Sequence, residues 1–589
     1  MKTFNVLKET AKLMAKESLM KTFWLYLSIL IVHSGLCVII LNLEKSIIDK
    51  ATNVSVIGIQ SVVISILVFF LFSNIINIFW VFRFLLMVVF GPKLDLVLRK
   101  TMINKIMKLD LIYFEDSEMF DAFNKAQNAT RFAVTSFTSV FQTLAAHMAT
   151  MVGIIIYVSY LNPLFIIILA CAAIPKILNY RYSIKKKVKL EDELANIRRK
   201  KGYYDECITS KNYFKETRIF NSFKYFKNLF VAATGDYNQK NWNVIKNLFP
   251  MQLIIEFANF LSYIITFGLA IYLLAKGQIT IGSFAVVFSA LQQLEGRINT
   301  IIGNIGRIAE QNAIAKNYFS FLELRESVHS KNNEISSPIN KIEFNNVCFS
   351  YPSNNHDVIK NLSLIIDKKE TIAVIGLNGA GKTTFIKLLM GLLYPSSGTI
   401  KYNDQNITEI NDNSIYDKQT AIFQNYGKYS ITMKENIAIS DVNCVEDEER
   451  IYSCLDKVGF SLDENRFPDK IQTKLGVEFG GTELSGGQWQ LIALSRAYFR
   501  ERELITLDEP SASIDPLREN ELFMQFQNLS DDKLTIIVTH RLNAAKMADR
   551  ILVFEDGRII EDGSHDELLE AQGKYTYLFN EQAKWYNGR

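Results

Sequence analysis

One segment, Gly376-Leu-Asn-Gly-Ala-Gly-Lys-Thr383, has the residue types and spacing that bind phosphate groups. It follows an apolar run at 372–375 and precedes a helical pattern that starts at Phe385. In such a strand–loop–helix context, backbone N–H groups and a helix N-terminus cradle phosphates, Lys382 reaches the β and γ groups, and Thr383 holds Mg²⁺. The segment therefore predicts a nucleoside triphosphate site, to which we assign Gly376, Asn378, Gly379, Gly381, Lys382, Thr383 and Thr384.

Two adjacent carboxylates, Asp508 and Glu509, follow the apolar run 504–507. A buried strand would deliver both to its carboxyl end, where an open α/β sheet places its ligand. Asp508 is suited to coordinate Mg²⁺ through water, and Glu509 to accept a proton from an attacking water. The alternative is a simple cap between a strand and a turn.

The segment Leu484-Ser-Gly-Gly-Gln488 resembles the signature motif of ATP-binding cassette (ABC) proteins, and other expected motifs occur in order over residues 341–570. The resemblance implies that Tyr351 stacks on adenine, that Gln424 is the Q-loop glutamine, and that His540 is the switch histidine. It also assigns Ser485, Gly486, Gly487, Gln488 and the D-loop residue Asp515 to nucleotide binding. Taken singly, each of these residues has a structural alternative: Tyr351 as a core aromatic, Gln424 as a solvated polar residue and His540 as a strand-end cap.

The catalytic set is therefore Glu509, His540 and Gln424, and the metal set is Thr383, Gln424 and Asp508, with ATP and Mg²⁺ as cofactors. The two glycines after Ser485 let a helix N-terminus approach anionic oxygens closely. In a head-to-tail dimer, this helix would bind the γ-phosphate held by the partner chain.

The composition argues against several other classes. A net charge of +4 over 589 residues does not indicate a nucleic-acid-binding protein. The six cysteines include no C-x-x-C pair and no metal-ligand spacing, which argues against a disulfide scaffold or a zinc site and favours a reducing compartment.

The first half of the chain carries apolar runs long enough to cross a bilayer, since about 20 residues span about 30 Å of hydrocarbon. We predict six spans: Phe23–Leu43, Val56–Phe79, Phe132–Tyr160, Leu164–Leu178, Leu248–Leu274 and Ile281–Ile302. Basic residues gather before the first run and in the two long connections, so both termini are expected in the cytosol. Buried helices of a soluble protein are the alternative.

Strand-like and helical segments alternate after residue 340, which is typical of an α/β domain. The expected fold is thus an α-helical membrane domain with long cytosolic extensions (1–320), a linker (321–340) and an α/β P-loop ABC ATPase domain (341–589). This order resembles an exporter half-transporter, which implies a homodimer in the cytoplasmic membrane working by alternating access. Coupling helices are expected at 113–126 and 213–220.

Motif detail resembles bacteriocin and lantibiotic-type peptide exporters without a peptidase domain, so the expected cargo is a peptide or another amphipathic compound. A multidrug or lipid exporter, half of a heterodimer, an importer and a soluble cassette ATPase are the alternatives. Within the runs, His33, His147 and Glu256 are single ionisable residues, and Asn74 and Asn77 share a helix face. Such residues line a cavity, form interhelical hydrogen bonds or lie at the membrane interface.

Overall fold

The structure is a computed structural model and describes residues 3–16, 19–115, 117–324, 326, 333–335, 337–352, 356–509, 526–527, 529–530, 532–541 and 545–586. It contains two compact units. The membrane unit comprises residues 1–106 and 121–324, and the cassette unit comprises residues 107–120 and 325–589.

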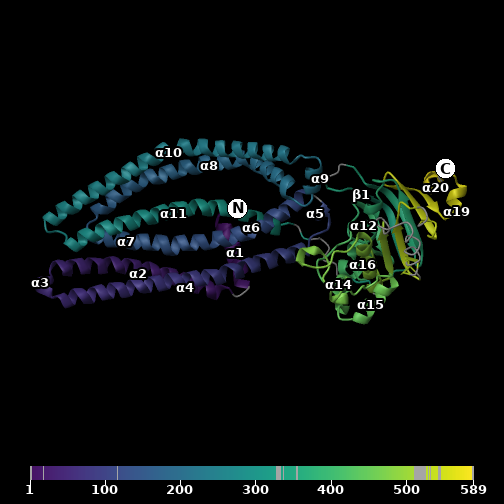
Figure 1. Cartoon of the computed structure of the whole chain (residues 1–589), viewed down its shortest axis with the longest axis horizontal. Helices are drawn as coiled ribbons and strands as arrows, with labels where there is room; N and C mark the ends of the chain where they lie inside the picture. Colours follow the sequence, from purple (N-terminus) through teal and green to yellow (C-terminus); the bar gives the residue numbers. More distant parts are fainter. Residues whose placement is uncertain are drawn as a thin grey trace. The chain divides into compact units, whose positions relative to one another are not determined.

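The membrane unit is built from long helices (Figure 1). Their bounds are α1 Thr3–Lys16, α2 Met20–Thr52, α3 Val54–Ile57, α4 Ile59–Ile106, α6 Ser117–Gln142, the π-helix η1 Thr143–Met148, α7 Ala149–Leu161, α8 Leu164–Thr209, α9 Phe214–Ile219, α10 Phe223–Ala275 and α11 Ile281–Leu322. Helix α8 runs beside α10, and α2 beside α4. At 1.5 Å per residue the 48 residues of α4 extend roughly 72 Å, well beyond a hydrocarbon layer.

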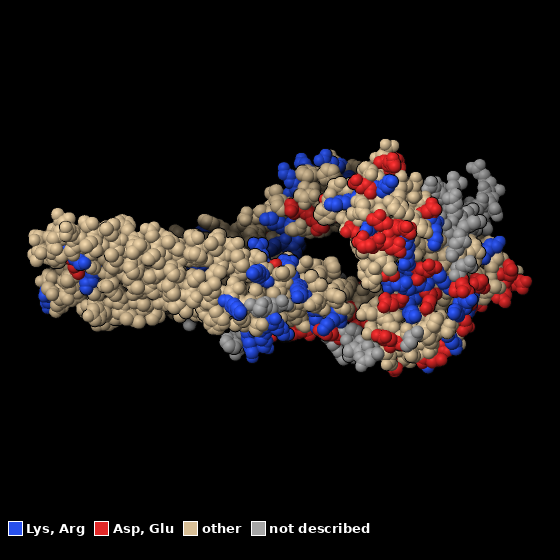
Figure 2. Space-filling model, turned by 90° about the horizontal axis from the view of Figure 1, so that it is seen from below, with Lys and Arg blue, Asp and Glu red and all other residues tan. Residues whose placement is uncertain are grey.

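Five helical segments of the described chain are long and apolar enough to cross a membrane: Met20–Thr52, Ile59–Ile106, Met119–Leu161, Leu164–Ile184 and Phe223–Ala275. They contain four of the first five predicted spans whole and most of the other, Val56–Phe79, which was predicted to begin three residues too early, since α3 ends at Ile57 and α4 begins only at Ile59. The sixth, Ile281–Ile302, lies in α11 and is not among them, because charged and amide side chains such as Gln292, Glu295 and Arg297 lower its hydropathy. On the face shown in Figure 2, charged side chains are nearly absent from a broad band of the membrane unit.

The cassette unit contains two sheets and short helices. A six-stranded sheet has the order β10-β9-β3-β8-β7-β6, parallel except for the β9–β10 pair, and a four-stranded antiparallel sheet has the order β2-β1-β4-β5. The strands are β1 Lys341–Phe349, β2 Ile359–Asp367, β3 Thr371–Gly376, β4 Ser397–Tyr402, β5 Gln405–Asn406, β6 Gln419–Ile422, β7 Leu504–Asp508, β8 Leu534–Val538, β9 Arg550–Glu555 and β10 Arg558–Gly563. The helices are α5 Ile112–Glu115, α12 Lys382–Leu389, α13 Asp412–Tyr416, α14 Met433–Ala438, α15 Glu448–Lys457, α16 Gly486–Phe499, α19 His565–Glu570 and α20 Lys574–Tyr586.

Two main apolar cores hold the cassette together. The first joins both sheets and α12, around Phe344, Phe385 and Phe554. The second joins α14, α15 and α16 to strands β6 and β7, around Ile437 and Trp489. Strands β3, β7 and β8 consist of almost wholly buried side chains, as expected for parallel strands covered on both faces.

Candidate functional site

The phosphate-binding loop lies where β3 ends and α12 begins. Gly376 has φ +152°, and a Cβ there would meet the Phe554 carbonyl oxygen at 2.3 Å. Gly381, the residue before α12, has φ +100°. Glycine is therefore required at both ends of the loop, once for a close approach of strands and once for a left-handed backbone.

Lys382 lies back across this loop. Its Nζ donates hydrogen bonds to the carbonyl oxygens of Gly376 (2.8 Å) and Leu377 (3.0 Å), and its side chain is buried. Burial lowers the pKa of Lys382, and the charges of Glu509 and Asp508 oppose that shift. The ammonium is thus placed beside the carboxylates expected to bind metal and water.

Three strand ends bring the predicted catalytic residues together. Gln424 follows β6, Glu509 follows β7 and His540 follows β8, and these strands are neighbours in the sheet. The Gln424 Nε2 donates to Glu509 Oε2 at 2.6 Å, and His540 Nε2 lies 2.7 Å from Glu509 Oε1. The Glu509 carboxylate is therefore in contact with both Gln424 and His540, one at each oxygen.

The backbone at Glu509 has φ +48°, a left-handed conformation that is uncommon for a residue with a side chain. Its N–H donates to the Val538 carbonyl at 2.9 Å, which ties the strained residue to β8. Such strain, on the order of 1 kcal/mol or more, persists where the surrounding structure enforces it, as at functional sites.

Burial shifts the pKa values of two groups next to Glu509, Asp508 and His540. Asp508 is buried, and burial together with the adjacent Glu509 raises its pKa, while Lys382 and Lys387 lower it. Burial and the charge of Lys382 lower the pKa of His540 from 6.5, against the opposing effect of Glu509. His540 is therefore neutral at pH 7, and its Nε2–H donates to the carboxylate.

The proposed metal ligands are oxygen donors. Thr383 is exposed on the first turn of α12 and Asp508 ends β7, while the Gln424 amide nitrogen faces Glu509 and leaves its oxygen as an acceptor. Hydroxyl, carboxylate and amide oxygens suit Mg²⁺, which is usually bound by few protein ligands together with phosphates. Accordingly, the described residues contain no cluster of three or more His, Cys, Asp and Glu side chains placed to hold a metal.

The signature segment caps a helix. Ser485 precedes α16, its Oγ accepts from the Gln488 N–H, and Gln488 Oε1 accepts from the Ser485 N–H. This reciprocal capping box fixes the helix N-terminus. Ser485 and Gly486 are exposed, so the amides of this end are accessible to an anion from outside the chain.

Tyr351 is half-buried, with its ring 5.0 Å from that of Phe349 and its hydroxyl 3.2 Å from Thr384 Oγ1. Thr384 belongs to α12, so the tyrosine lies beside the phosphate-binding helix. Asp515 lies outside the described residues.

The chain resembles known transporters over most of its length. Family models described as ABC transporter transmembrane region and ABC transporter match residues 23–298 and 359–512. The subtilin transport ATP-binding protein SpaT of Bacillus subtilis is 31% identical over 497 residues, which cover 82% of this chain and 81% of SpaT. The chain belongs to the ABC transporter family.

Other relatives of this ABC transporter include the nisin transport ATP-binding protein NisT of Lactococcus lactis subsp. lactis, 28% identical over 83% of this chain and 82% of NisT. The ATP-dependent lipid A-core flippase of Bordetella avium is 28% identical over 52% of this chain and 51% of its own. A solved bacterial Atm1-family ABC exporter with ATP bound has the same fold, with a TM-score of 0.78 over 96% of this chain and 98% of that one at 18% identity. The transporter is thus a membrane protein that binds and hydrolyses ATP to drive transport.

The transporter's cassette unit includes a segment from between two membrane helices. Ile112 of α5 packs against the first core, and Lys387 Nζ of α12 pairs with Glu115 Oε1 at 2.9 Å. A cavity of about 580 Å³ lies between this segment, the loop around Tyr394 and helix α13, which ends at Tyr416. The helix that carries Lys382 at its first position therefore contacts the predicted coupling region through Lys387.

In the transporter's membrane unit, polar residues mostly bond within the bundle. His147 Nδ1 lies 3.2 Å from Arg297 Nη1, and Asn74 donates to the Phe70 carbonyl of its own helix at 2.8 Å. Glu256 is exposed, and its two oxygens accept from Gln252 (3.0 Å) and Asn259 (3.4 Å). Sequence reasoning missed the ion pair of Lys176 with Glu295, although each is a charged residue inside a predicted span.

Proposed function

We propose that this ABC exporter moves a lantibiotic-type peptide out across the cytoplasmic membrane. The observation that carries the proposal is the similarity to the subtilin and nisin transport proteins over more than four-fifths of the chain. The lipid A-core flippase matches only about half of it. A lipid or multidrug exporter, alone or as half of a heterodimer, is the rival function.

In this proposal the cassette works at the ends of β3, β6, β7 and β8. Lys382 and the loop glycines bind the β- and γ-phosphates, while Tyr351 contacts adenine. When bound, Mg²⁺ would be held by Thr383, Gln424 and Asp508 and would neutralise phosphate charge. Glu509 accepts the proton of the attacking water, and neutral His540 holds the carboxylate through its Nε2–H.

The proposed assembly is a homodimer whose ATP sites are shared. Ser485 and the glycines of one protomer would bind the γ-phosphate held by the partner's loop, with Asp515 at the same interface. Two features support this: the exposed N-terminus of α16, and its attachment to the second core while the P-loop belongs to the first.

The proposed topology has six spans, the sixth in α11, with both termini in the cytosol. The proposed domains are 1–320 and 341–589 joined by 321–340. Basic residues in the two long connections support this orientation.

The test is transport by the purified protein in proteoliposomes. We expect ATP-dependent accumulation of fluorescently labelled nisin in vesicles with outward-facing cassettes, and none with Glu509→Gln. Accumulation of a labelled lipid or a hydrophobic dye without any of the peptide would refute peptide export and favour the rival function.

A further inference from the structure

The membrane unit contains an apolar cavity of about 610 Å³ between α7, α8 and α11. Its walls are isoleucine, methionine and alanine side chains, among them Met151, Ile166, Ile177 and Ile302, and Tyr180 alone carries a polar side-chain atom. Pockets that bind small molecules have volumes of about 300–1,000 Å³, are mostly apolar and include a few polar groups that orient the ligand. The cavity has the volume and the apolar lining of such a pocket.

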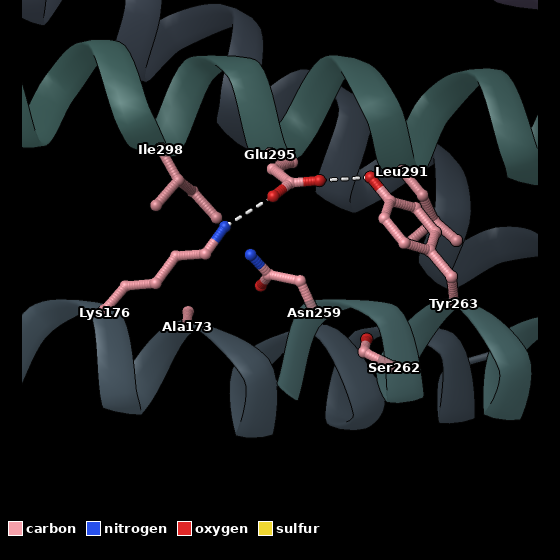
Figure 3. Close-up of a pocket in the computed structure, with 8 residues that line it drawn as sticks. All are labelled: Ala173, Lys176, Asn259, Ser262, Tyr263, Leu291, Glu295 and Ile298. Atoms are coloured by element: carbon pink, nitrogen blue, oxygen red, sulfur yellow. Dashed lines mark hydrogen bonds and ion pairs between the residues drawn. The ribbon is translucent and has the colours of Figure 1, made fainter. Parts of the chain in front are cut away.

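Polar groups lie beside this cavity, in a recess whose lining residues are drawn in Figure 3. Ala173 and Ile298 border both the cavity and a small polar recess. In the recess, Lys176 Nζ pairs with Glu295 Oε1 at 2.7 Å, and the Tyr263 hydroxyl donates to Glu295 Oε2. These three residues come from α8, α11 and α10, so one carboxylate joins three helices.

The three residues share a level in the helix bundle. At 1.5 Å per residue, Lys176 lies roughly 18 Å from Leu164, Tyr263 roughly 18 Å from Ala275, and Glu295 roughly 21 Å from Ile281. These distances place the ion pair inside a hydrocarbon layer about 30 Å thick. Ionisable groups at such a depth are costly and mark substrate or ion pathways.

The anion of this pair is the better fixed member. Glu295 is held by the Tyr263 hydroxyl as well as by Lys176, whereas Lys176 reaches Glu295 on a four-carbon chain with rotatable bonds. A second carboxylate, Glu256, accepts a 3.4 Å hydrogen bond from Asn259, which lines the same recess. Two carboxylates against one ammonium leave a net negative charge, which complements a cation.

We propose that the cavity and Glu295 together form a binding site for an amphipathic cation, in which a primary ammonium of the cargo replaces that of Lys176 on Glu295. The apolar part of the cargo fills the cavity between α7, α8 and α11. This inference rests on the proposed export function and deepens it: the cargo carries an amine next to branched apolar groups, as a lysine among aliphatic residues does.

The experiment is equilibrium binding to the full-length protein in lipid nanodiscs without nucleotide. The probes are acetyl-Leu-Leu-Lys-amide and the same peptide with its lysine Nε acetylated, which differ in charge. We expect the ammonium probe to bind about tenfold more tightly, the scale of one desolvated charge pair. Equal affinities of the two probes would overturn the proposal.

Three variants localise the effect. Glu295→Gln should reduce the preference for the ammonium probe to less than about twofold, and Lys176→Met should increase it, because the competing ammonium is gone. Ala170→Leu should weaken both probes by narrowing the cavity. Glu310→Gln, an exposed carboxylate of the same helix outside the cavity, is the matched control and should bind both probes as wild type. Retention of the charge preference in Glu295→Gln, or unchanged binding in Ala170→Leu, would contradict the site.

Folding is checked by ATP binding to the cassette of each variant. The assay measures no transport, so its outcome is separable from that of the proposed function. Peptide export together with equal probe affinities would refute this site alone, whereas ammonium-selective binding without peptide export would refute the peptide cargo alone.

Discussion

The substitution Glu509→Gln tests the assigned general base with little change in shape. Glu509 accepts one hydrogen bond from Gln424 and one from His540. A glutamine keeps one acceptor oxygen and presents its NH₂ to the other donor, so about one hydrogen bond is lost, which costs about 1–3 kcal/mol locally. ATP binding should survive, because the phosphate contacts come from the loop at 376–384.

The rate should fall much further than binding does. A positioned general base contributes about 10²- to 10⁴-fold, which corresponds to about 2.7–5.4 kcal/mol of activation free energy. We would measure single-turnover ATP hydrolysis, with ATP binding by a fluorescent analogue in parallel. The control is Glu464→Gln, an exposed glutamate of the same unit, which should hydrolyse ATP as wild type. Hydrolysis by Glu509→Gln within about fivefold of wild type would remove Glu509 from the role.

Three further predictions concern the cassette. Because the pKa of His540 is lowered from 6.5, ATPase activity should stay level from pH 8 to about 6.5 and fall only at lower pH, where His540 becomes protonated. The substitution His540→Gln should abolish this decrease at low pH. An inflection of the wild-type pH profile above pH 6.5 would contradict the assignment of a lowered pKa to His540. Gly376→Ala should lower the free energy of unfolding of the cassette by about 2–3 kcal/mol and weaken ATP binding, because its Cβ would clash with the Phe554 carbonyl oxygen. Gly379 has φ +82° but open space around a Cβ, so Gly379→Ala should lower the free energy of unfolding by only about 1 kcal/mol, measured by denaturant unfolding. Equal losses of stability in the two variants would refute the clash. Ser485→Ala and Ser564→Ala each remove a helix capping box and should each lower the free energy of unfolding by about 1 kcal/mol. Only Ser485→Ala should also reduce ATPase activity. Equal ATPase activities of the two variants would argue against nucleotide binding by the signature segment.

Short motifs made the nucleotide site predictable. The loop at 376–383 and the Asp508-Glu509 pair each follow an apolar strand, and the carboxyl ends of neighbouring parallel strands meet at one edge of a sheet. The contact of Gln424 and His540 with Glu509 therefore follows once these residues are assigned to adjacent strands. The strained backbone of Glu509 was not predictable, because no residue type in the sequence signals a left-handed glutamate.

The membrane unit was harder to predict because its pairings join distant residues. Lys176 and Glu295 are separated by 119 positions, and only helix packing brings them together. Glu295, together with Arg297, also lowers the hydropathy of α11 and separates this helix from the five more apolar segments. The membership of residues 107–120 in the cassette unit also depends on tertiary contacts, since this segment resembles any polar connection between spans.

The assignment of residues 107–120 to the cassette gives the two units more than one covalent connection. The chain passes from one unit to the other three times, near residues 106, 120 and 324. A unit joined to the rest of a chain by a single peptide connection can rotate freely about it. Three separate connections restrict both rotation and translation of the unit. Two of these connections lead directly into α4 and α6. A displacement of α12 that moves Glu115 through its ion pair with Lys387 therefore applies force to both helices. The ion pair between Lys387 and Glu115 would then couple movement of α12 to the membrane helices. High salt screens this pair, so it should lower the amount of cargo transported per ATP hydrolysed.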